Sequence, residues 1–154
     1  MEQLVKKAKE LFENGTVSCI IGYAAVSGTR RLHPFIANNV KDAENLTFNH
    51  YALNNLSVYL NMVDRSKGGK TGIVVKGCDV NSVLTGIRQY QLRREDVLII
   101  GMECSGVVND YLKQWSNENM ADKCINCPVR VPNFVDILIT EKENKVFTND
   151  KLVA

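Results

Sequence analysis

The segment TGIVVKGCDVNSVLTGIRQYQLRREDVLIIG, residues 71–101, decides the fold. It begins with an apolar run predicted as a strand, Thr71 to Lys76, and ends with a second predicted strand, Asp96 to Gly101. The apolar positions between them share one helical face: Val80, Val83, Leu84 and Ile87. Asp79 is placed to cap that helix. Because such a strand-helix-strand connection is a right-handed crossover between parallel strands, the segment predicts an α/β domain on a small, mostly parallel sheet.

Hydrophobic spacing predicts further elements around this unit. An amphipathic helix opens the chain and stops at Asn14 and Gly15. After it we expect a strand over 16–26, a partner strand or irregular edge over 32–40, and a helix over 49–63 with His50 as a cap. A further helix is predicted after residue 101, and its apolar face carries Val107, Val108, Leu112 and a core Trp115. The chain should end with a strand over 135–140 and a short hairpin or loose tail over 141–154. No linker divides this pattern, so we expect residues 1–154 to form a single domain with flanking helices.

The composition is that of an ordinary globular protein. Of its 154 residues, 45% are hydrophobic and 23% are charged, and the formal net charge is +2. The longest apolar runs have the length of a strand and fall well short of the roughly 20 residues that span a membrane. Acidic residues interrupt the basic clusters, as where Arg93 and Arg94 precede Glu95 and Asp96. Neither a membrane span nor a nucleic-acid-binding surface is therefore expected.

The first residues, MEQLVKKAKELFENG, alternate acids with lysines and do not follow the pattern of an export signal. We therefore expect a cytoplasmic protein. Because thiols stay reduced in that compartment, the five cysteines are expected to be free thiols, metal ligands or redox groups and not structural disulfides.

Two of the cysteines, Cys78 and Cys104, each follow a predicted strand. Parallel strands end at the same edge of a sheet, which is the edge where open α/β sheets bind ligands. Each thiol also precedes a predicted helix, whose N-terminal amides should lower the pKa of the thiol. The neighbouring Gly77 and Gly106 would leave room for a bulky inorganic group. Cysteine is also one of the most buried residue types, so both could equally be small core residues.

A second pair of cysteines lies in CINCP, where Cys124 and Cys127 are separated by two residues in a cysteine-rich loop. Such pairs occur in zinc sites, iron-sulfur clusters and dithiol redox sites. Together with Cys78 and Cys104 they make four thiolates, the number that a 4Fe-4S cluster or a tetrahedral zinc ion requires. Cys19 lies inside an apolar strand and is expected to be a core residue.

The stretch VVKGCDVNSVLTGIRQYQLRREDVLIIGMECSGVV, followed by CINC and VPNFVDILI, resembles the coenzyme F(420) hydrogenase/dehydrogenase beta subunit family, which includes formate dehydrogenase beta-type subunits. RRLHPFIANNVKDAENLTFN and NNLSVYL are similar to the same family's N-terminal region. The resemblance runs from about Gly15 to Ile139. It implies that one 4Fe-4S cluster is bound by Cys78, Cys104, Cys124 and Cys127, and it does not include Cys19.

The resemblance implies an iron-sulfur electron-transfer subunit that is not itself catalytic. Its partners would be other subunits of a hydrogenase or dehydrogenase complex, or a ferredoxin-like electron carrier. Two alternatives stay open: a structural scaffold with zinc bound by four cysteines, and a flavin- or dithiol-dependent oxidoreductase, with flavin bound at a subunit boundary.

Overall fold

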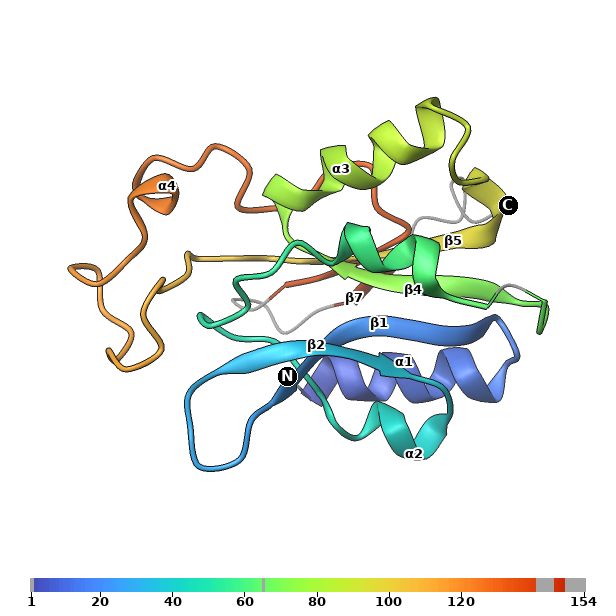
Figure 1. The fold of residues 1–154 in the computed structure, drawn as a ribbon, viewed down its shortest axis with the longest axis horizontal. Coiled ribbons are helices and arrows are strands. Elements are labelled where there is room, and N and C mark those ends of the chain that lie inside the picture. The colour runs from blue at the N-terminus through green and yellow to red at the C-terminus, as the bar shows by residue number, and fades with distance from the viewer. Residues whose placement is uncertain (1, 65, 141–145, 149–154) are drawn as a thin grey trace.

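A seven-stranded mixed sheet forms the centre of the protein. The structure is a computed structural model that describes residues 2–64, 66–140 and 146–148. The strands follow the order β2-β1-β4-β5-β6-β7, with β3 also paired to β1 (Figure 1). Their bounds are β1 Val17–Ala25, β2 Leu32–Ala37, β3 Leu46–Thr47, β4 Lys70–Val75, β5 Val97–Met102, β6 Ile137–Ile139 and β7 Val146–Thr148. The neighbours β1, β4, β5 and β6 are parallel, whereas β2, β3 and β7 are antiparallel to their partners.

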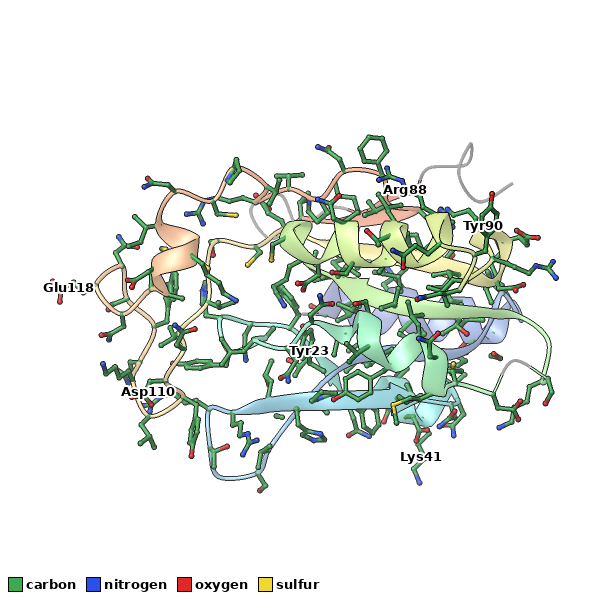
Figure 2. All side chains as sticks on the ribbon, turned by 45° about the horizontal axis from the view of Figure 1, so that its top comes forward. Tyr23, Lys41, Arg88, Tyr90, Asp110 and Glu118 are labelled. Carbon is green, nitrogen blue, oxygen red and sulfur yellow. The ribbon has the colours of Figure 1, made fainter. Side chains whose placement is uncertain are left out.

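Helices cover the strands on two sides (Figure 1). The described helices are α1 Glu2–Glu13, α2 Val40–Ala43, α3 Gly77–Arg88 and α4 Asp122–Ile125, with 3-10 turns η1 Leu56–Met62 and η2 Arg94–Asp96. Helix α4 lies away from the strands, at the left of Figure 1. In Figure 1, α1 and α2 lie below the strands and α3 lies above them. Tyr23 of β1 is fully buried between these layers, whereas Tyr90, just after α3, lies at the surface (Figure 2). Among the described residues, no helix has the length and hydrophobicity needed to cross a membrane.

The α/β fold predicted from residues 71–101 is confirmed. Strand β4, helix α3 and strand β5 form the expected crossover unit, and β4 and β5 pair in parallel. The opening helix, the strand over 16–26 and its antiparallel partner are also present. Residues 146–148 form the returning strand of a hairpin with β6, while 141–145 and 149–154 of the predicted tail lie outside the described residues.

The prediction of a helix after β5 was wrong, because the backbone groups of Val107 and Val108 form hydrogen bonds with residues far from them in the sequence. The amide of Val108 donates to the carbonyl of His50 at 2.8 Å, and the amide of Ala121 donates to the carbonyl of Val107 at 2.8 Å. Both valines are buried, yet 74% of Leu112 is exposed, so no continuous apolar helical face exists. Residues 103–121 instead form a loop that contains only turns and bends.

The helix predicted over 49–63 is reduced to the 3-10 turn η1. Two asparagine side chains explain the change. The Oδ1 atom of Asn49 accepts from the amide of Tyr51 at 2.8 Å, and Oδ1 of Asn55 accepts from the amide of Ser57 at 3.1 Å. Such local bonds compete with helical hydrogen bonds and favour turns. His50 therefore caps no helix.

A buried carboxylate joins β6 to β5. Asp136, which is 1% exposed, accepts the amide of Ile99 through Oδ2 at 2.7 Å, and its own amide donates to the carbonyl of Ile99 at 2.9 Å. Its other carboxylate oxygen pairs with Arg94, whose guanidinium also donates to the carbonyl of Val97 at 2.7 Å. This one side chain therefore fixes where β6 enters the sheet.

Replacing this carboxylate should weaken the fold. Asp136→Ala should lower the free energy of unfolding by about 2–3 kcal/mol, since a charge-assisted bond is lost and the buried amide of Ile99 loses its acceptor. Arg93 and Glu95 form an exposed ion pair in the same segment, so Glu95→Ala is the matched control and should leave the free energy of unfolding nearly unchanged. Urea denaturation of the metal-free protein measures the free energy of unfolding of both variants. Equal losses in the two variants would contradict the role given to Asp136.

Candidate functional site

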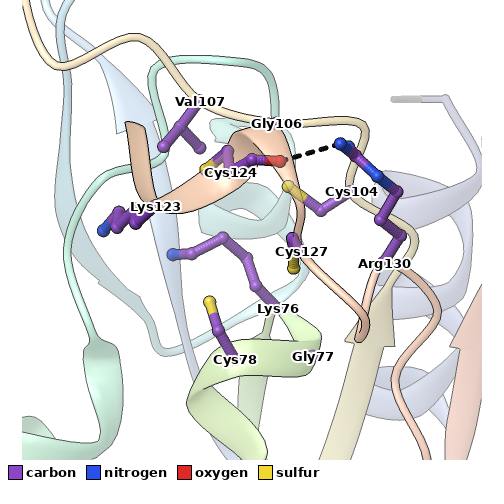
Figure 3. Close-up of a pocket in the computed structure, with 10 residues that line it drawn as sticks. All are labelled: Lys76, Gly77, Cys78, Cys104, Gly106, Val107, Lys123, Cys124, Cys127 and Arg130. Carbon is purple, nitrogen blue, oxygen red and sulfur yellow. Dashed lines mark hydrogen bonds between the residues drawn. The ribbon is translucent and has the colours of Figure 1, made fainter. Parts of the chain in front are cut away.

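Four cysteines line one cavity of about 100 Å³ beyond the carboxyl ends of β4 and β5 (Figure 3). Cys78 follows β4 and Cys104 follows β5, while Cys124 and Cys127 belong to a segment that folds back over both (Figure 3). The structure thus brings together all four residues that the sequence nominated as ligands. Their role as ligands stays a prediction.

Cys19 lies elsewhere, as expected. It is 3% exposed within β1, and its sulfur is 4.0 Å from the hydroxyl oxygen of Thr71. Burial raises the pKa of its thiol. Cys19 is therefore a core residue.

Cys78 lies within the first turn of α3, not before the helix. The helix begins at Gly77, two residues earlier than the predicted cap at Asp79. The carboxylate of Asp79 does not cap the helix, because its Oδ2 atom pairs with the ammonium of Lys76 at 2.8 Å. The helix can start directly after the strand because Gly77 lets another backbone approach.

Gly77 makes room for protein, not for a bound group. A Cβ atom at this position would lie 1.8 Å from the carbonyl oxygen of Val129. The cysteine-proline loop, residues 124–131, therefore packs its backbone directly on the start of α3. Gly106 has a different requirement, since its φ of +126° is rarely adopted by other residues.

A buried lysine lies at the floor of the site. Lys76 is 3% exposed, and its Nζ atom donates to the hydroxyl oxygen of Tyr23 at 2.9 Å and to the carbonyl of Asn54 at 3.1 Å, besides pairing with Asp79. Burial alone would lower the pKa of Lys76, but Tyr23 and Asp79 more than offset this and raise it. Lys76 is therefore a permanent cation beside the cavity. In the sequence, the position of Lys76 at the end of an apolar strand was the one sign that this lysine could lie near the site.

The thiol of Cys78 is not activated in the metal-free protein. Its sulfur points into the cavity although the residue as a whole is exposed (Figure 3). Burial raises the pKa of this thiol to about 11, with a further contribution from the charge of Asp79, while Lys76 and Lys123 act in the opposite direction. The lowered pKa expected from the helix N-terminus was therefore wrong for Cys78, and no helix follows Cys104.

Arg130 connects the segments that carry the other cysteines. Its guanidinium donates to the carbonyl of Cys124 at 2.8 Å and to the carbonyl of Ser105 (Figure 3 shows the bond to Cys124). Its own carbonyl accepts the amide of Cys104 at 2.8 Å. Ser105 therefore takes part in the site through its backbone carbonyl. Nothing in the sequence distinguished Arg130 from an exposed arginine.

An aromatic pair lies next to the cavity. The rings of His50 and Trp115 are stacked with centroids 3.7 Å apart, and Nδ1 of His50 lies 2.9 Å from the carbonyl oxygen of Gly106. Both residues are half-buried. Trp115 is therefore not the core residue that the predicted helix required.

The four thiols line the same cavity. Among the described residues, no three cysteine, histidine, aspartate or glutamate side chains gather where one metal ion could bind. A tetrahedral zinc ion needs its four sulfurs about 2.3 Å from one centre. In an iron-sulfur cluster, by contrast, each thiolate binds a different iron atom.

Comparisons with known proteins identify the fold. No protein-family model matches the sequence, and no curated protein matches it either. The fold is similar to that of a chain in the xenon-derivatized F420-reducing NiFe hydrogenase complex of Methanosarcina barkeri, with a TM-score of 0.72 over 99% of this chain and 69% of that chain. At 15% sequence identity, this likeness establishes a shared fold.

Removing the buried cation should destabilise the protein. Lys76→Met leaves the carboxylate of Asp79 without its partner and should lower the free energy of unfolding by about 3–5 kcal/mol. Adding Asp79→Asn should restore part of this loss, because the uncompensated charge is then gone. Lys123→Met, an exposed lysine that lines the same cavity, is the control and should change the value by less than about 0.5 kcal/mol. Urea denaturation of the metal-free protein decides, and equal effects of the two lysine variants would refute the interpretation.

The raised pKa of Cys78 should be visible in its chemistry. Because the folded protein holds the proton more tightly than the unfolded chain, this thiol contributes stability below about pH 9 that is lost as the pH rises toward about 11. Alkylation of Cys78 in the folded, metal-free protein should therefore still rise about tenfold per pH unit between pH 9 and pH 10, whereas the urea-unfolded chain should already level off. Mass spectrometry after iodoacetamide treatment measures both profiles, and coincident profiles would contradict the prediction.

Proposed function

We propose that this protein is an iron-sulfur electron-transfer subunit, in which Cys78, Cys104, Cys124 and Cys127 bind one 4Fe-4S cluster. It exchanges single electrons with other subunits of a redox complex or with a ferredoxin-like carrier. One observation carries the proposal: the four thiols come from three separate segments and line one cavity at the ligand-binding edge of the sheet.

The charges around the cavity suit an anionic group. Lys76, Lys123 and Arg130 all line it, and Cys78 lies in the first turn of α3. These cations offset the negative charge that four thiolates and a cluster bring together. Bound here, a cluster would supply one-electron oxidation and reduction.

The resemblance of the sequence favours a cluster over the alternatives. It implies an iron-sulfur group, whereas four cysteines alone suit a 4Fe-4S cluster and a single zinc ion equally. A cavity of about 100 Å³ is smaller than the roughly 300–1,000 Å³ of organic cofactor sites, so a flavin would have to bind elsewhere, as at a subunit boundary. The chain with the similar fold belongs to an F420-reducing hydrogenase complex, which supports a place in a redox assembly.

Anaerobic reconstitution with iron and sulfide tests the proposal. The wild type should bind about four irons and four sulfides per chain, with broad visible absorbance. Serine at any one of Cys78, Cys104, Cys124 and Cys127 should remove most of the iron. Cys19→Ser makes the same chemical change outside the cavity, so it should retain the cluster and lose only packing stability.

Three results would contradict the proposal. They are a colourless protein with one zinc ion, a metal-free protein with a titratable dithiol, and full cluster content in all four cavity variants.

A further inference from the structure

The cysteine-proline loop contacts every segment that carries a thiol of the cavity. The backbone of Val129 packs against Gly77, which directly precedes Cys78. The carbonyl of Arg130 accepts the amide of Cys104 at 2.8 Å. The guanidinium of Arg130 then reaches back to the carbonyl of Cys124, also at 2.8 Å. Val129 and Arg130 are therefore adjacent residues on which the segments of the cavity converge.

The two hydrogen bonds of the Arg130 side chain join two segments that are separated in the sequence. One acceptor, the carbonyl of Ser105, directly follows Cys104, and the other belongs to Cys124 itself. A planar guanidinium can bind both acceptors at once, whereas an ammonium is a single point donor. The side chain thus acts as a clamp across the cavity wall.

Within the part of the chain that the structure describes, no acid pairs with the guanidinium of Arg130. Its guanidinium binds carbonyl oxygens. Lys76 differs, since its charge is paired with Asp79. Arg130 therefore contributes a positive charge to the lining of the cavity.

We propose that Arg130 is a positioning residue for the cluster: it holds Cys104 and Cys124 at their ligand positions before the cluster binds, and its charge stabilises the more negative, reduced form. This inference rests on the proposed function. The two roles are separable, because positioning needs the two-pronged guanidinium and charge compensation needs only a cation.

Three variants separate these roles. Arg130→Gln removes the clamp and the charge, Arg130→Lys keeps the charge but not the clamp, and Arg88→Gln removes the same charge from an exposed site at the far end of α3 (Figure 2). Each protein is reconstituted anaerobically, and three quantities are measured. They are the rate at which an iron chelator bleaches the cluster, the reduction potential, and the melting temperature of the metal-free form.

Arg130→Gln should lose its cluster about 10- to 100-fold faster than the wild type, the range typical of residues that orient metal ligands. Its potential should become more negative, because the reduced cluster loses a nearby cation. Arg130→Lys should bleach faster too but keep a potential near that of the wild type. Arg88→Gln should match the wild type in both. Loss of the two guanidinium bonds should also lower the melting temperature of the metal-free Arg130→Gln variant. The reduction potential, which a purely structural role would leave unchanged in a variant that still holds its cluster, therefore separates the two roles.

The outcomes are decisive in each direction. A wild type that retains no iron and sulfide would overturn the proposed function and this inference with it. A wild type with a full cluster and an Arg130→Gln variant that bleaches at the same rate would overturn this inference alone. If Arg130→Gln does not fold, Arg130→Lys decides, and bleaching at the wild-type rate would overturn the positioning role.

Discussion

The buried ammonium of Lys76 is the constraint on which the rest of the site depends. A charge withdrawn from water is tolerated only where protein groups replace its hydration. Those groups come from three places: the Tyr23 hydroxyl of β1, the Asn54 carbonyl ahead of η1, and the Asp79 carboxylate of α3. Satisfying one cation therefore fixes the end of β4, the start of α3 and the chain before η1 relative to one another. Cys78 lies between these anchored residues, so its thiol is placed by the same network.

Backbone contacts complete the cavity above this floor. Gly77 admits the carbonyl of Val129, and the carbonyl of Arg130 accepts the amide of Cys104. These contacts are made by backbone groups, so the backbone itself holds the segments that carry the thiols around the cavity. A site organised in advance spends less free energy on ordering its ligands when a group binds. The raised pKa of Cys78 means that binding a metal there must also release a proton.

Much of the fold was predictable because its signals are local. Apolar runs in 71–101 and the handedness of strand crossovers were enough to predict β4, α3, β5 and their parallel pairing. The same rule placed Cys78 and Cys104 at one edge, and the structure adds Cys124 and Cys127 to their cavity. The predicted helix after β5 failed because its apolar spacing was coincidental. Val108 pairs with the carbonyl of His50, which is distant in sequence.

The fold class, the four thiols that line the cavity and the burial of Cys19 were all predictable from the sequence, because periodicity and chain direction are properties of short segments. Four features depend on the tertiary structure: the backbone that packs on Gly77, the buried cation of Lys76, the span of Arg130 between two segments and the raised pKa of the Cys78 thiol. Desolvation and hydrogen bonding depend on which distant residues come into contact, and no spacing rule within the chain contains that information.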